Sequence, residues 1–304
     1  MNRKSLLSLV CGGVLLAGPQ FFTSPTAAAL PGVPQTIFQI VQNSDDFDTL
    51  EVALTTANLD GVLDGTDRFT VFAPTDAAFE LLGMETINAL LADVPTLDLI
   101  LKYHVLAGDV PASQVTTSTF LTTLADQRVD ITLQGSDAFV DGVKISTVDV
   151  PAANGIVHII DAVLQPNTRK LLETAGDLGF STLDTAVGAT MLGPVLDGDG
   201  PFTVFAPDDA AFNLLPPSGL NSLVTTQVDL LSLVLQYHVV PGRLYADQVT
   251  QVSELTTVLG AKLQVRNVGG VFFINGSRLT QTDVETRNGN IHVINKVLGG
   301  ERLF

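Results

Sequence analysis

The stretch Phe69-Thr-Val-Phe-Ala-Pro-Thr-Asp-Ala-Ala-Phe79 occurs a second time, as Phe202-Thr-Val-Phe-Ala-Pro-Asp-Asp-Ala-Ala-Phe212. The two copies are identical at ten of eleven positions and lie 133 residues apart. A fixed spacing of this kind marks a repeated structural unit, and roughly 130 residues can bury a hydrophobic core of their own. The chain is therefore predicted to contain two tandem copies of one domain.

Three further pairs of blocks extend the repeat in the same order. They are Phe47-Asp-Thr-Leu50 with Phe180-Ser-Thr-Leu183, Tyr103-His104-Val105 with Tyr237-His238-Val239, and Asn154-Gly155-Ile-Val-His158 with Asn288-Gly289-Asn-Ile-His292. The first pair keeps the spacing of 133, and the later two have a spacing of 134. We predict domains at residues 34–165 and 167–300, joined by a linker too short to act as a flexible tether.

Each copy begins with helical patterns and ends with extended ones. Ser44-Asp45-Asp46 is predicted to cap a helix that carries Phe47, Leu50 and Leu54. The run 69–73 predicts a buried strand that Pro74 ends, and Thr75 with Asp76 is predicted to cap the next helix. Residues 96–103 read as a helix that runs into a strand, and 128–134, 138–140, 143–148 and 156–163 read as strands. This order predicts an α+β fold.

The first 29 residues have the features of a secretory signal peptide. A short basic head with Arg3 and Lys4 precedes an apolar run at 6–17 and three alanines at 27–29. Cleavage there would remove Cys11, the single cysteine, and would take the formal net charge from −17 to −19. So acidic a chain is not expected to bind nucleic acid, and no stable membrane insertion is expected after cleavage. An exported, soluble protein without disulfides is predicted.

These repeated blocks resemble the two signatures of the fasciclin family, a Thr-Val-Phe-Ala-Pro-Thr-Asp block and an Asn-Gly-x-x-His-x-Ile-Asp block. The resemblance covers nearly all of the chain after the signal peptide, with Asn295 in the second copy where the first has Asp161. It implies a wedge of β-sheet packed with several helices and a secreted, periplasmic or cell-surface location. It also implies a role in cell adhesion or matrix interaction, with a cell-surface or matrix protein or glycan as partner.

The resemblance also suggests a set of partner-binding residues. Partner-binding positions of animal members correspond to Asp149, Val150, Asp283, Val284, Tyr103, His104, Tyr237 and His238. Valine stands where those members have isoleucine, which argues against integrin as the partner. A structural role is expected for Pro74, Thr75, Asp76, Asn154, His158, Pro207, Asp208, Asp209, Asn288 and His292.

Catalytic and metal-binding signatures are missing from the sequence. There is no Gly-x-Ser-x-Gly elbow, no Gly-Lys-Ser/Thr phosphate loop and no His-Glu-x-x-His pair. All four histidines fall in the repeated blocks and are interpreted as hydrogen-bonded parts of the fold rather than metal ligands. The acidic run 197–200 is interpreted as a turn rather than a calcium loop, and Asn275-Gly276 and Asp141-Gly142 as hairpin turns.

The sequence therefore favours a binding protein without enzymatic activity, cofactor or metal. The alternative is a carrier for an apolar small molecule such as a carotenoid, held in a groove between helices and sheet. A third hypothesis, hydrolysis by a pair such as His158 with Asp161, is disfavoured because no nucleophile motif accompanies it.

Overall fold

The computed structural model describes residues 34–198 and 200–299. The predicted signal peptide and the predicted last residue of the second domain lie outside the described residues. The residues that are described belong to one compact unit, which begins at Pro34. In this part of the chain no helix combines the length and the apolar character that crossing a membrane requires.

The first repeat contains helices and strands in the predicted order. Its helices are α1 (Ile37–Gln42), α2 (Asp48–Thr56), α3 (Asp60–Leu63), α4 (Asp76–Glu80), α5 (Met84–Ala92), α6 (Val94–Tyr103) and α7 (Ala112–Val115). Its strands are β1 (Phe69–Pro74), β2 (Val105–Ala107), β3 (Phe120–Thr122), β4 (Arg128–Gln134), β5 (Asp137–Val140), β6 (Val143–Ala152) and β7 (Gly155–Ile160).

The second repeat has the same succession of elements. Its helices are α8 (Leu171–Asp177), α9 (Ser181–Thr190), α10 (Gly193–Leu196), α11 (Asp209–Phe212), α12 (Pro217–Thr225), α13 (Val228–Tyr237) and α14 (Ala246–Val249). Its strands are β8 (Phe202–Pro207), β9 (Val239–Pro241), β10 (Glu254–Thr256), β11 (Lys262–Val268), β12 (Val271–Ile274), β13 (Ser277–Thr286) and β14 (Gly289–Ile294).

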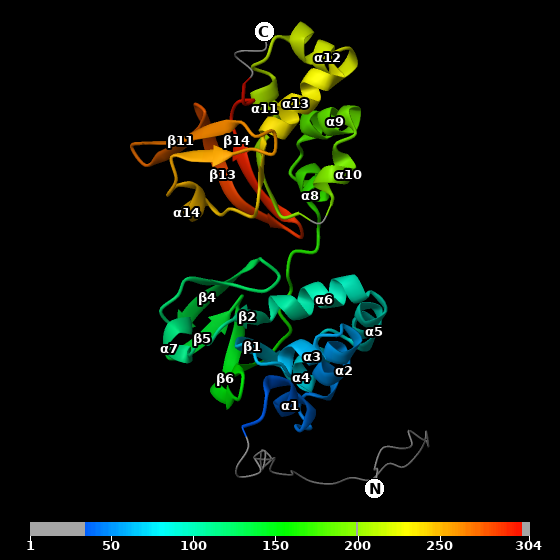
Figure 1. Cartoon of the computed structure of the whole chain (residues 1–304), viewed down its shortest axis with the longest axis vertical. Coiled ribbons are helices and arrows are strands. Elements are labelled where there is room, and N and C mark those ends of the chain that lie inside the picture. The colour runs from blue at the N-terminus through cyan, green and yellow to red at the C-terminus, as the bar shows by residue number, and fades with distance from the viewer. Residues whose placement is uncertain (1–33, 199, 300–304) are drawn as a thin grey trace. The chain divides into compact units, whose positions relative to one another are not determined.

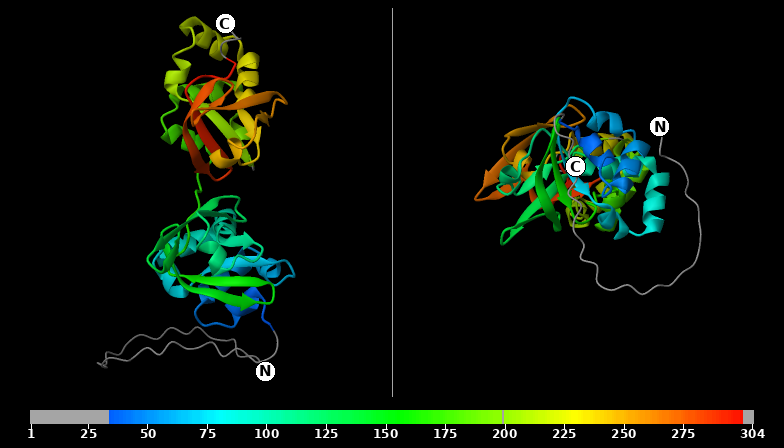
Figure 2. Two further views of the ribbon diagram at one scale, coloured as in Figure 1. Left: turned by 90° about the vertical axis from the view of Figure 1, so that its left-hand side faces the viewer. Right: turned by 90° about the horizontal axis from the view of Figure 1, so that it is seen from below.

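Each repeat builds one sheet of seven strands from its described residues. The strand order is β2-β1-β7-β6-β5-β4-β3 in the first and β9-β8-β14-β13-β12-β11-β10 in the second. The pairs β1 with β7 and β8 with β14 are parallel, and the other pairs are antiparallel. Figure 1 shows the longer helices of each repeat gathered on one side of its strands, and Figure 2 shows the twist of the sheets from two other directions. The α+β fold predicted from the sequence is confirmed.

The signature strand β1 lies between two apolar cores. Val71 and Ala73 pack into the cluster between the helices and the sheet, whereas Phe72 packs into a second cluster enclosed by β4 to β6. Every residue of β1 is buried, which suits a central strand covered on both faces. The second repeat divides its core in the same way around β8.

The cap predicted for α2 is wrong. The helix begins at Asp48, and Ser44-Asp45-Asp46 lies before its N-cap residue, Phe47, which makes no side-chain cap. The carboxylate of Asp76 instead accepts hydrogen bonds from the backbone N–H groups of Asp48 and Thr49, at 3.1 and 2.8 Å. A partner 27 or 28 residues away supplies the free N–H groups of the first turn, so a purely local rule could not find it.

The two predicted hairpin turns have the expected backbone geometry. Asp141 and Gly142 both have positive φ, as do Asn275 and Gly276, which is the geometry of a two-residue hairpin turn. Strand β6 extends four residues past the predicted end at Val148, because a bulge lets it continue alongside β7.

Candidate functional site

The histidine of the second signature, His158, is held at both ring nitrogens. The backbone N–H of Asp149 donates to Nδ1 at 3.2 Å, so the proton is on Nε2, which donates to the carbonyl of Val110 at 2.9 Å. The ring is fully buried and lies 5.6 Å from the ring of Phe72, centroid to centroid. His292 repeats these contacts with Asp283 and Leu244.

The other histidine of each repeat carries its proton on the opposite nitrogen. The backbone N–H of Leu164 donates to Nε2 of His104 at 2.9 Å, and Nδ1–H donates to the carbonyl of Ile100 at 2.8 Å. His238 makes the matching bonds with Leu298 and Val234. Burial lowers the pKa of both His104 and His238 to about 4, and it lowers the pKa of His158 and His292 as well. All four rings are thus neutral, and each connects two backbone segments through hydrogen bonds.

Asp149, a predicted partner-binding residue, lies at the bulge in β6 with a φ of 58°. Its Oδ1 accepts a hydrogen bond from the backbone N–H of Ala112 at 2.8 Å, at the first residue of α7. Asp283 makes the same contact with Ala246 in the second repeat, at 2.7 Å. Both aspartates lie on the surface, and each holds a short helix against the sheet.

The remaining predicted partner-binding residues differ in exposure. Val150 and Val284 are half-buried against the helix-side cores. His104, His238 and Tyr103 are buried, and Tyr237 is half-buried. The structure therefore leaves mainly the two aspartates on the surface, and partner binding by this set stays a prediction.

Asn154 ties three segments together. Its Oδ1 accepts from the N–H of Ile37 at 2.8 Å, and its Nδ2 donates to the carbonyls of Leu63 and Gly65 at 2.7 and 3.0 Å. Asn288 makes the equivalent bonds with Leu171, Leu196 and Gly198. A Cβ on the following Gly155 would lie 1.8 Å from the carbonyl oxygen of Phe69, so only glycine fits beside β1.

The residues of the first signature also form hydrogen bonds within the fold. Thr75 and Asp208 accept hydrogen bonds from Ala78 and Ala211 as N-caps of α4 and α11. Asp209 accepts from Ser181 Oγ and the N–H of Thr182, the counterpart of the Asp76 contacts. Pro74 and Pro207 end the parallel strands β1 and β8. These residues form hydrogen bonds within the fold or end its parallel strands, and a structural role for them stays a prediction.

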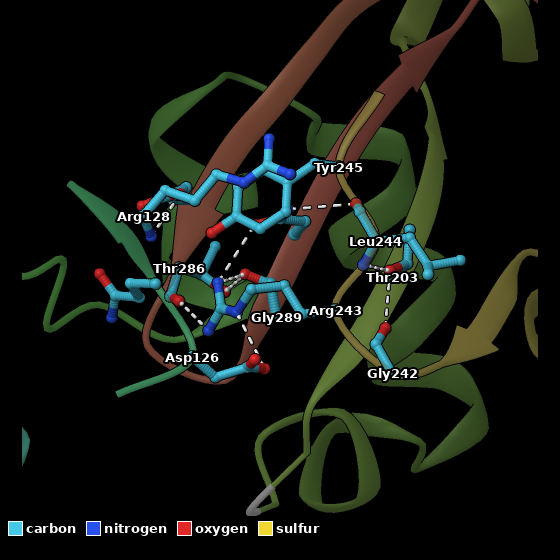
Figure 3. Close-up of polar contacts among 12 residues, drawn as sticks. Asp126, Arg128, Thr203, Gly242, Arg243, Leu244, Tyr245, Thr286 and Gly289 are labelled. Carbon is cyan, nitrogen blue, oxygen red and sulfur yellow. Dashed lines mark hydrogen bonds and ion pairs between the residues drawn. The ribbon is translucent and has the colours of Figure 1, made fainter. Parts of the chain in front are cut away.

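The first and second repeats contact each other through residues that differ between the two copies. This contact region is called the junction. Arg128, the first residue of β4, donates from Nη1 and Nη2 to the two carboxylate oxygens of Asp247, both at 3.0 Å. Its guanidinium carbon lies 3.6 Å from the ring centroid of Phe120 and 3.7 Å from that of Tyr245. A planar guanidinium suits both a paired carboxylate and stacked rings. Figure 3 shows Arg128 over the Tyr245 ring.

A second arginine, Arg243, lies almost fully buried nearby, with 1% of its side chain exposed. It donates to the carbonyls of Thr286 and Gly289 at 2.9 and 2.6 Å, in the turn between β13 and β14. Asp126 of the first repeat lies 3.5 Å from its Nε (Figure 3). The linker joins the same junction, because Asn167 Nδ2 donates to the carbonyl of Glu285 at 2.6 Å.

A family model of the fasciclin domain matches residues 45–166 and 178–299. The chain belongs to the fasciclin domain family. Each matched segment contains one seven-stranded sheet, the helices from α2 or from α9 onward, and both signature blocks.

Several relatives share this domain. The chain is 26% identical to human periostin over 271 residues and 29% identical to the transforming growth factor-beta-induced protein ig-h3 of Sus scrofa over 269. Each alignment covers 88% of this chain but only 32% and 38% of the relative, so the chain spans about a third of their length. Protein sll1483 of Synechocystis is 42% identical over 125 residues, which cover 41% of this chain and 69% of that protein.

A solved structure of a FAS1 domain pair from the insect cell adhesion molecule fasciclin I is also similar. It has a TM-score of 0.41 and 22% identity, and the match covers 84% of this chain and 97% of that chain.

The predicted carrier groove would lie between the helices and sheet of a fasciclin domain. An apolar cavity is found there in the second domain, bordered by residues such as Leu183, Phe205 and Leu235, with a volume of about 30 Å³. Sites for small organic ligands have volumes of about 300–1,000 Å³. This cavity is therefore about tenfold too small for a carotenoid.

Among residues 34–198 and 200–299, no group of three or more His, Cys, Asp or Glu side chains is arranged to hold a metal ion. Asp199, which the calcium hypothesis would need, lies outside the described residues.

The sequence did not predict the junction between the two fasciclin domains, because the residues that form it match no known motif. Its main side chains are Asp126, Arg128, Arg243, Tyr245, Asp247 and Glu285. At the corresponding positions of the other fasciclin domain, 134 residues away, stand Gly260, Lys262, Asp109, Pro111, Ser113 and Pro151. These residues could have been found in the sequence because they differ between the two copies. A contact between two copies of a domain uses a different face of each copy, so its residues need not repeat.

Proposed function

We propose that the protein is an exported binding protein without enzymatic activity, which acts in cell adhesion or in contact with an extracellular matrix. Its partner would be a protein or glycan of the cell surface or matrix. The proposal builds on membership of the fasciclin family.

One observation supports binding rather than catalysis. The ring nitrogens of all four histidines are engaged in hydrogen bonds, and two of the rings have a pKa of about 4. A general base needs a pKa near the working pH and an open nitrogen facing a substrate. These histidines offer neither, so they are poor candidates for general-base catalysis.

The proposal predicts saturable attachment to cells or matrix. Surfaces coated with the protein should retain cells of the source organism, and free protein should compete for that attachment. The control is a folded protein of equal net charge without a fasciclin domain, which separates specific contact from charge effects. Retention equal to that control at every coating density would refute the proposed role.

A further inference from the structure

The junction of the two fasciclin domains encloses a cleft of about 510 Å³. Its walls carry five carboxyl groups but a single guanidinium, that of Arg128. The carboxyl groups belong to Asp130 and Asp141 of the first domain and to Asp247, Asp283 and Glu285 of the second. A volume of this size lies within the range of about 300–1,000 Å³ that small-ligand sites occupy.

The cation already in the cleft neutralises only one of these acids. Arg128 is bound at both ends of its guanidinium fork to Asp247. The other four carboxyl groups form no ion pair with any side chain that the structure describes. The cleft therefore carries an excess of negative charge within walls that are partly shielded from water.

A tyrosine whose buried hydroxyl has no partner forms part of the cleft wall. Tyr245 is 4% exposed and lines the cleft, yet its hydroxyl group has no hydrogen-bond partner. Burial raises the pKa of this tyrosine, and the nearby Glu285 carboxyl raises it further without meeting hydrogen-bond geometry with the hydroxyl. Leaving a buried hydroxyl unpaired is unfavourable, and a donor that reaches it from the cleft would give it a partner.

Burial of the acids points in the same direction. Desolvation raises the pKa of Glu285, which faces Tyr245, Arg128, Arg243 and Asp141. It also raises the pKa of Asp141, which faces Tyr103 and Asp130. Desolvation disfavours the ionised form of these carboxyl groups, and a cation that enters the cleft would favour it.

We propose that the cleft between the two fasciclin domains binds a primary ammonium or guanidinium group. The group could belong to a lysine or arginine side chain of a partner protein or to a free amine. Its N–H donors would meet the carboxylates and the Tyr245 hydroxyl. For a partner protein the inference rests on the proposed adhesive function; for a free amine it stands on the cleft alone.

Intrinsic fluorescence gives a direct test, since the chain has three tyrosines and no tryptophan, and Tyr103 and Tyr245 both line the cleft. The whole protein would be titrated with Nα-acetyl-lysinamide, Nα-acetyl-argininamide and putrescine, with Nα-acetyl-glutaminamide as the neutral control. We expect a saturable change with the cationic probes that weakens with added salt and strengthens as the pH rises through the carboxyl pKa range. Putrescine against the amino-acid amides distinguishes a free-amine site from a side-chain site.

Two variants locate the binding. Asp130→Asn removes one exposed carboxylate without touching the Arg128 contacts, and we expect it to weaken binding about fivefold. Tyr245→Phe keeps the ring under Arg128 and should also weaken binding, with Tyr103 as the remaining reporter. Asp229→Asn, on the exposed face of α13, removes the same charge elsewhere and should have no effect.

An equal response to the neutral amide, or identical affinities in Asp130→Asn and Asp229→Asn, would overturn the inference. Either failure would leave the adhesion assay unaffected, because that assay does not depend on where the contact lies. Loss of cell attachment with intact amine binding would instead refute the adhesive role and keep the cleft.

Discussion

The guanidinium of Arg128 in the first fasciclin domain makes two parallel 3.0 Å hydrogen bonds to the carboxylate of Asp247 in the second. Bidentate pairs are geometrically specific, and this one is also enclosed by two aromatic rings. Its counterparts by repeat spacing are Lys262 and Ser113, which cannot form the same pair. The two domains therefore carry the same scaffold but have distinct faces for each other.

Capping of α2 by Asp76 gives the first prediction. Asp76→Ala should lower the free energy of unfolding by about 1–2 kcal/mol, because two N–H groups of the first helical turn lose their acceptor. Asp45→Ala is the matched control, since Asp45 lies before the N-cap residue and should change stability little. Urea denaturation measures both, and equal losses in the two variants would contradict the capping role.

The close approach of Gly155 to β1 gives the second. Gly155→Ala places a methyl group 1.8 Å from the Phe69 carbonyl oxygen, so the parallel pair of strands must separate. We expect a loss of about 3 kcal/mol or more, or failure to fold. Gly188→Ala, inside α9 with nothing within 4 Å of the new Cβ, should instead stabilise by up to about 1 kcal/mol. Thermal unfolding of the pair checks the contrast.

The buried histidines predict a fall in stability toward acid pH. The pKa of His104 and His238 is lowered to about 4 in the fold, so the unfolded chain binds more protons between about pH 6.5 and 4. Stability is fully present above that window and is lost as the pH falls through it, by on the order of 3 kcal/mol for each histidine.

Denaturant titrations at pH 7.5 and 4.5 measure this slope. The double variant His104→Gln with His238→Gln should be less stable at pH 7.5 but should show a shallower decline with acid. The pKa values of Asp141 and Glu285 are raised in the fold, so protonation of these two groups stabilises the folded state as the pH falls. This contribution opposes that of the histidines, and the double variant keeps it. An unchanged slope would contradict the neutral-histidine account.

Repetition made much of this fold predictable. The repeated blocks predicted the strand β1 and separated structural candidates such as Asn154 from the rest of the chain. The extended pattern of residues 128–134 predicted the strand β4, and an Asp-Gly pair predicted the hairpin turn at Asp141. Local rules failed where the partner was distant, as with Asp76 and α2. They could not reach the junction, because Arg128 and Asp247 are 119 residues apart and neither belongs to a repeated block.

Scanning calorimetry of the whole protein tests most directly the claim that the two fasciclin domains act as one unit joined at Arg128. We predict a single transition with equal calorimetric and van't Hoff enthalpies for the unmodified chain and for Lys262→Ala, which removes the equivalent side chain of the second domain. Arg128→Ala should unfold in two separable transitions. Two transitions in the unmodified chain, or an Arg128→Ala profile that matches Lys262→Ala, would contradict the account.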